Sequence, residues 1–147
     1  MKEIWFKAKK ISDGEWVEGF YVMHSTSISH PYSHTNGEHY ILTVPHNAKY
    51  KIDPETLSQY TGLTDKNGKK IFEGDIVKFH DSITINGSNI HHSAVEWVAE
   101  FSGFMIHADC IGYYNVNPTQ VKQYEMEVAG NIFDNPDLLT TSSTDSD

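Results

Sequence analysis

The sequence predicts a mainly β protein in which a short-stranded N-terminal β unit precedes a small β barrel. Short β-favouring segments alternate with clusters of Gly, Asn, Asp and Ser along most of the 147 residues. Asn67-Gly68 is a strong hairpin signal, because a type I′ turn needs positive φ at both central positions. Residues 93–101 and 124–129 alternate between apolar and polar side chains, which is typical of half-buried strands.

In the N-terminal part, residues 4–8 and 16–23 are rich in aromatic and β-branched side chains and flank a Ser-Asp-Gly turn signal. They predict a hairpin whose aromatic side chains pair across the strands. Residues 24–38 are Ser, Thr, His, Asn, Pro and Gly for the most part and predict a long exposed loop. Further strands are expected at 39–44 and 50–53, and Asp53-Pro54 predicts the start of a single helical turn.

In the second part, segments on both sides of Asn67-Gly68 predict the arms of a hairpin, and Asp65 is expected to accept a hydrogen bond from a downstream amide. A turn at Gly74 leads into a strand at 76–79, followed by a loop around 86–89 and further short strands. Strands this short bury their apolar face best when the sheet curls on itself. We therefore expect an N-terminal β region over residues 1–58, a barrel region over 59–139 and a disordered acidic tail over 140–147.

The composition favours some classes of function over others. Twenty acidic residues against eleven basic ones give a formal charge of −9, which disfavours nucleic acid as a partner because phosphates are neutralised by clustered Lys and Arg. Cys110 is the only cysteine, so neither an intramolecular disulfide nor a thiolate metal cluster can form within one chain. The sequence has no signal-like N-terminal apolar run and no apolar stretch of membrane-spanning length, so we expect a cytoplasmic protein.

Three segments carry a resemblance to a known family. These are QYTGLTDKNGKKIFEGDIV at 59–77, GNIFDNPDLL at 130–139 and the opening MKEIWFKA. In this order they resemble the hallmarks of the YopX family, small proteins of bacteriophages and prophages. The resemblance implies an SH3-like barrel in the C-terminal half and no enzymatic activity or catalytic residues. It also implies that protein-specific function belongs to the variable regions, here 25–38 and 82–93.

The histidines raise the alternative of a metal-dependent hydrolase. A zinc reading takes His30, His34 and His39, or the pair His91-His92, together with a carboxylate such as Glu38. Four-residue spacing aligns two ligands only on a helix, and the Pro-containing, Ser-rich segment around His34 argues against one. An exposed histidine-rich loop without metal is the favoured interpretation.

Other catalytic patterns are weaker still. The segment from Gly62 to Lys70 is one residue too long for a P-loop and lacks the hydroxyl residue and the following helix. Glu73 and Asp75 flank a turn glycine, where carboxylates usually accept hydrogen bonds from backbone amides. Cys110 with His107 has no orienting partner in the sequence. We therefore expect no enzyme, no metal and no cofactor.

Aromatic residues offer two binding interpretations. Trp5, Trp16, Phe20 and their aromatic neighbours interleave with lysines and could stack single-stranded bases, although cross-strand packing also explains them. Tyr113 and Tyr114 are adjacent, so on a strand one of them faces outward and is available to a partner. The candidate partner-binding residues are Tyr113, Tyr114, His91, His92 and His34.

The leading hypothesis is a noncatalytic phage or prophage accessory protein that binds a host or phage protein in the host cytoplasm. Self-association is a further expectation, because the edge strands of small sheets invite pairing. The alternatives are a nucleic-acid-associated SH3-like module and, least favoured, a small metal-dependent hydrolase.

Overall fold

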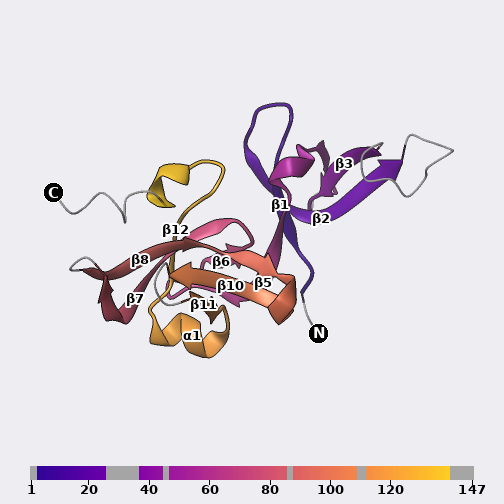
Figure 1. The fold of residues 1–147 in the computed structure, drawn as a ribbon. Coiled ribbons are helices and arrows are strands. Elements are labelled where there is room, and N and C mark those ends of the chain that lie inside the picture. Colours follow the sequence, from indigo (N-terminus) through magenta and orange to yellow (C-terminus); the bar gives the residue numbers. More distant parts are fainter. Residues whose placement is uncertain (1–2, 26–36, 45–46, 86–87, 109–111, 140–147) are drawn as a thin grey trace. The chain divides into compact units, whose positions relative to one another are not determined.

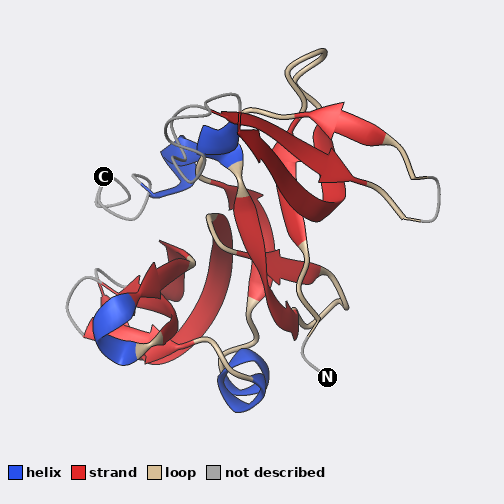
Figure 2. Cartoon of the chain, turned by 90° about the vertical axis from the view of Figure 1, so that its right-hand side faces the viewer, coloured by secondary structure: helices blue, strands red, loops and turns tan. Residues whose placement is uncertain are grey.

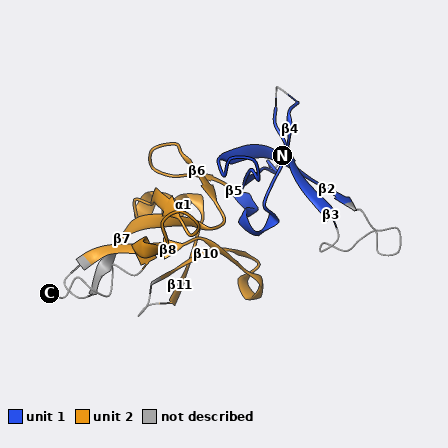
Figure 3. Ribbon diagram, turned by 90° about the horizontal axis from the view of Figure 1, so that it is seen from above, with its two compact units in different colours: residues 1–60 blue, residues 61–147 orange. Residues whose placement is uncertain are grey.

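Strands predominate over short helical segments in the computed structural model of the chain (Figure 2), which describes residues 3–25, 37–44, 47–85, 88–108 and 112–139. The predicted mainly β class is confirmed, whereas the SH3-like form of the barrel stays a prediction. Chain contacts divide the molecule into two compact units, residues 1–60 and 61–147 (Figure 3). The candidate His34 and the predicted tail beyond residue 139 lie outside the described residues.

The first unit is built on antiparallel strands in the order β4-β3-β2-β1, with the start of β5 beside β1 (Figure 1). Its elements are β1 (Phe6–Lys9), β2 (Trp16–Ser25), β3 (Gly37–Leu42), β4 (Lys49–Lys51), the 3₁₀ turn η1 (Pro54–Thr56) and the beginning of β5 (Ser58–Thr64). The expected helical turn is present, and the Asp53 side chain accepts a hydrogen bond from the Glu55 amide at 3.0 Å.

Alternation along these strands separates two faces of the sheet. Ala8, Ile41 and Ile52 are buried in one cluster, with Phe6 and Tyr21 packed against it. The alternate residues of β1 and β2 lie on the opposite face, because successive strand side chains point to opposite sides. The N-terminal sheet therefore has one core face and one outer face.

The second unit contains two three-stranded antiparallel sheets, in the orders β12-β7-β8 and β11-β10-β9, together with the end of β5 beside β6. Its strands are β6 (Lys70–Phe72), β7 (Asp75–Ile85), β8 (Ser88–Ala94), β9 (Glu96–Val98), β10 (Gly103–Ala108), β11 (Gly112–Asn115) and β12 (Glu127–Asn131). Its helical segments are η2 (Ala99–Phe101), α1 (Pro118–Gln123) and η3 (Pro136–Leu139). No helix within the described ranges is long and apolar enough to span a bilayer.

Both sheets and the helix of this unit contribute to one core. Its buried members are Ile71, Val77, Phe79, Val95, Ile106, Val121 and Met126. Asp75 fixes the turn before β7, because its buried carboxylate accepts a hydrogen bond from the Phe72 amide at 2.8 Å. Asp75 therefore accepts a hydrogen bond from a backbone amide, as expected of a carboxylate at a turn.

The structure corrects the expected loop over residues 82–93. β7 continues to Ile85 and pairs with β8 as a hairpin, with His80 opposite Ile90 and Ile85 opposite Ser88. The two histidines assigned to that loop, His91 and His92, are therefore strand residues. The predicted strand 93–101 is likewise divided: β8 ends at Ala94, β9 covers three residues and η2 follows.

Candidate functional site

The adjacent tyrosines of β11 lie in different environments. Tyr114 packs against the core, with its ring centroid 6.3 Å from that of Phe79 and 5.3 Å from that of Tyr124. Tyr113 is 49% exposed. The two point to opposite sides of the strand, so Tyr113 offers a surface to a partner and Tyr114 offers little.

The strand histidines are largely covered. His91 is 8% exposed and its ring lies 5.5 Å from that of Phe79. His92 is half-buried, and burial, followed by the charge of Lys78 opposite it and by His91, lowers its pKa. These two side chains therefore have packing roles that limit their contact with a partner.

An exposed aromatic group surrounds Tyr113. The ring centroid of Tyr113 lies 5.7 Å from that of Phe101, which is 54% exposed, and 5.0 Å from that of His107. Phe101 is the last residue of η2, and His107 is opposite Tyr113 in the β10–β11 register. We call Phe101, His107 and Tyr113 the outer patch.

The outer patch lies on the face of the β9-β10-β11 sheet that points away from the core. Ile106 on β10 is fully buried in the core, so the neighbouring His107 points to the opposite face. Glu96 is also on this face, because it is opposite Met105 in the β9–β10 register; Met105 itself is buried, although it is not a member of the cluster around Ile106. Both Glu96 and Glu100, the residue before Phe101, are exposed. The patch is thus aromatic with an acidic border.

The sequence predicts Tyr113 as a partner-binding residue, but no sequence pattern predicts Phe101 or His107 beside it. The alternating pattern predicts Phe101 as the last residue of a half-buried strand, whereas in the structure it ends η2, and Ser102 after it adopts a left-handed conformation with φ of 49°. The Ser102-Gly103 turn signal was the clue available in the sequence. It could not show which side chain the turn would leave exposed.

The histidines of the metal hypothesis do not converge where the structure describes them. His39 is buried and its Nδ1 lies 2.7 Å from the Tyr21 hydroxyl, on the core side of β3. Glu38 instead contacts Lys51 Nζ at 3.2 Å on the outer side. Within the described ranges no group of three His, Cys, Asp or Glu side chains could hold a metal ion.

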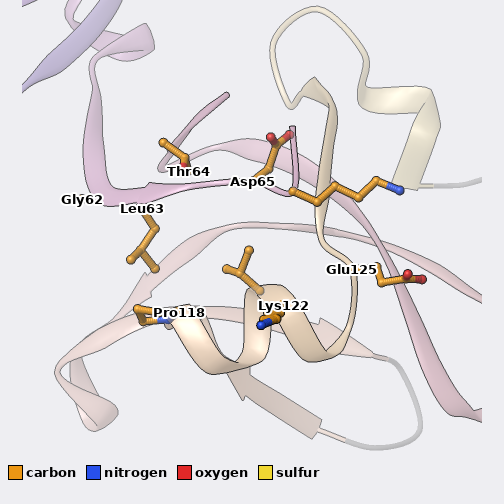
Figure 4. A pocket seen from close by; sticks show the side chains of 9 residues that line it. Gly62, Leu63, Thr64, Asp65, Pro118, Lys122 and Glu125 are labelled. Carbon is orange, nitrogen blue, oxygen red and sulfur yellow. The ribbon is translucent and has the colours of Figure 1, made fainter. Parts of the chain in front are cut away.

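A pocket of about 520 Å³ lies between the end of β5 and α1 (Figure 4). Leu63 and Pro118 line one end of it, and Glu125 lies at the other. Its one buried carboxylate, Asp65, accepts hydrogen bonds from the amides of Asn67, Lys69 and Val128 at 2.8 to 2.9 Å. That carboxylate is engaged with the backbone, which is a structural use and not an acid–base arrangement.

Comparison with known proteins gives the family. A model of the family described as "YopX protein" matches residues 5–140, nearly the whole chain. The chain belongs to the YopX family. Among solved structures, protein EF1440 from Enterococcus faecalis matches with a TM-score of 0.57 and 21% identity, over 95% of this chain and 99% of that one. This likeness shows a shared fold. The search of curated proteins finds no match.

The hallmark segments of this YopX protein have structural roles. As expected, Asp65 accepts a hydrogen bond from a downstream amide of this turn, and it also ties the turn to β12 through Val128. The type I′ turn predicted at Asn67-Gly68 is wrong: Gly68 has a positive φ of 82° but Asn67 does not, and the Gly68 amide donates to the Asp65 carbonyl across Lys66 and Asn67. At the C-terminal hallmark, a Cβ on Gly130 would lie 2.4 Å from Asn135 Oδ1, so only glycine leaves room for that side chain. Residues that mark the family therefore stabilise the fold.

Proposed function

We propose that this YopX protein is a noncatalytic accessory protein that binds another protein through the outer patch. The observation that carries the proposal is the exposed pair Phe101 and Tyr113, about half of whose surfaces contact solvent while their rings are 5.7 Å apart. Aromatic side chains supply most of the binding energy of many interfaces. Two adjacent aromatic rings with large exposed surfaces suit a partner that covers both.

The acidic border indicates the chemistry of the partner. Glu96 and Glu100 flank the patch, and arginine or lysine side chains stack favourably on Tyr and Phe rings. Charge complementarity of this kind speeds association and excludes acidic competitors. We therefore infer a partner surface that presents arginine or lysine beside an apolar group. A host or phage protein in the bacterial cytoplasm is the proposed source, and self-association is a second possibility within the same proposal.

The test compares two double variants of the full chain as baits in host lysate. Phe101→Ala/Tyr113→Ala removes the outer patch, whereas Phe20→Ala/Tyr50→Ala removes an exposed Phe and Tyr of the first unit. We expect the wild type and the second variant to retain the same protein and the first to lose it, with affinity falling roughly thirtyfold or more for the purified pair. Recovery of no specific protein at micromolar bait, or equal recovery by all three baits, would contradict the proposal.

A further inference from the structure

The outer face of the N-terminal sheet has an unusual composition for a solvent-facing surface. Strand register places lysines and aromatic rings together on it: Lys7 is opposite Glu18, Lys9 is opposite Trp16, and Tyr40 is opposite Lys51. We define the lysine–aromatic face by the side chains of Trp5, Lys7, Lys9, Trp16, Glu18, Phe20, Tyr40, Lys49 and Lys51. The opposite side of the same strands carries the core.

Cations lie directly over rings on this face. Lys7 Nζ is 4.8 Å and Lys9 Nζ is 5.5 Å from the centre of the Trp16 ring. Lys49 Nζ is 4.1 Å from the centre of the Tyr40 ring. Stacking surface and positive charge are therefore adjacent at two places.

Phe20 lies between these two places along β2. Its ring is 47% exposed and makes an edge contact with Trp5 at 5.3 Å. Trp16 and Val22, the residue opposite Tyr40, are six positions apart on β2, so the two lysine groups are separated by about 20 Å. An extended chain of several nucleotides covers such a span.

The charge of the protein is distributed unevenly between its units. Residues 1–60 contain six lysines and seven acidic residues, whereas residues 61–147 contain five lysines and thirteen acidic residues. Most of the net charge of −9 therefore belongs to the second unit. The lysine–aromatic face carries four lysines and one glutamate, Glu18, and the neighbouring Glu38 pairs with Lys51. The negative charge of the whole chain therefore does not exclude nucleic acid from this face.

We propose that the lysine–aromatic face binds single-stranded nucleic acid, with bases stacked on Phe20, Trp16 and Tyr40 and phosphates held by Lys7, Lys9, Lys49 and Lys51. Stacking on aromatic side chains tolerates any base, and lysines beside the rings can contact the phosphates. This binding is separate from the proposed function, because its residues belong to the first unit and the outer patch belongs to the second.

The experiment is a fluorescence anisotropy titration of labelled oligothymidylate with the full chain, at low and rising salt. We expect the logarithm of the association constant to fall with the logarithm of the salt concentration at a slope of roughly −2 to −3. Each single-strand phosphate contact contributes about −0.7, and the four lysines provide four such contacts. Phe20→Ala should weaken binding about tenfold or more, since a stacked base is lost. Lys49→Gln/Lys51→Gln should make the slope shallower by about 1.4, since two phosphate contacts of about 0.7 each are removed.

Matched controls come from the second unit. Phe101→Ala removes an exposed phenylalanine and Lys66→Gln/Lys122→Gln removes two exposed lysines, and neither should change oligothymidylate binding. Circular dichroism confirms that each variant is folded. The proposal is overturned by a flat titration at low salt, or by equal losses in Phe20→Ala and Phe101→Ala. Displacement of the oligonucleotide by polyglutamate at equal charge would also overturn it, by showing a site for acidic polymers.

Discussion

At the scale of single residues, Asp65 has the largest structural role of any carboxylate described above. Asp65→Ala would leave three backbone amides without their acceptor, two in the Lys66–Lys69 turn and one on β12. Hydrogen bonds to a charged group contribute about 1.5–3 kcal/mol each, and the losses overlap. We expect the free energy of unfolding, measured in urea, to fall by about 3 kcal/mol or more.

Asp53→Ala is the matched control for Asp65→Ala. Its exposed carboxylate accepts one amide hydrogen bond as the cap of η1, so its loss should cost about 1 kcal/mol. Equal costs for the two substitutions would show that the Asp65 network contributes no more than an ordinary cap.

His92 gives the protein a predictable response to acid. Burial lowers its pKa in the folded state, so the unfolded chain binds a proton more readily as pH falls below about 6.5. The contribution of neutral His92 to the free energy of unfolding is therefore fully present above that pH, and it is lost as the pH falls toward the folded-state pKa. Urea denaturation between pH 7 and 5 should show a smaller loss of unfolding free energy in His92→Gln than in the wild type. A pH dependence unchanged in His92→Gln would contradict this.

Local chemistry at single residues was predictable from the sequence, but their exposure was less so. The hydrogen bond from a downstream amide to Asp65 and the cap at Asp53 depend on neighbours within four residues. The exposure of Tyr113, by contrast, depends on which face of β11 meets the core. Pairing with β10 decides which of the two tyrosines faces the core, because Tyr114 is opposite the buried Ile106. The sequence around the tyrosines does not contain this information.

At the scale of elements, the close approach of β2 to β3 depends on Gly19. A Cβ at this position would lie 2.0 Å from the backbone oxygen of Leu42, which cannot rotate away as a side chain can. We expect Gly19→Ala to lower the free energy of unfolding by about 3 kcal/mol or more, at the upper end of overpacking costs. Gly14→Ala, in a turn with open space and φ of 74°, should cost about 1 kcal/mol. Similar melting temperatures for both variants would refute the prediction.

Alternation and turn signals predict most of the strands. They do not predict segments that are strands only because they form hydrogen bonds with a neighbouring strand. Residues 82–93 contain several Ser, Asn and His residues and one Gly, and they predict a variable region with a loop around 86–89, yet the β7–β8 ladder pairs His80 with Ile90 and Ile85 with Ser88. Tyr113 and Tyr114 likewise follow a glycine and precede an asparagine, yet they lie in β11, which pairs with β10 at four positions from Gly112 to Asn115. In both cases hydrogen bonding to a neighbouring strand outweighs weak local propensity.

The whole molecule combines a nearly neutral first unit with a strongly acidic second one. Like charges repel within a folded unit, and salt screens them over about 10 Å at 0.1 M. Raising the salt concentration should therefore stabilise residues 61–147 more than residues 1–60. This difference also separates the two proposals, because a basic partner is attracted to the acidic unit and a nucleic acid to the lysines of the other.

The tryptophans allow the effect of salt on stability to be measured separately for each unit. Trp5 and Trp16 lie in the first unit and Trp97 lies in the second, so Trp97→Phe leaves fluorescence from the first and Trp5→Phe/Trp16→Phe leaves fluorescence from the second. We expect the unfolding midpoint reported by Trp97 to rise with salt up to about 0.15 M, and the midpoint reported by Trp5 and Trp16 to change less, because only the second unit carries a large excess of like charge. Coincident midpoints with the same salt dependence would show instead that the chain unfolds as one cooperative unit.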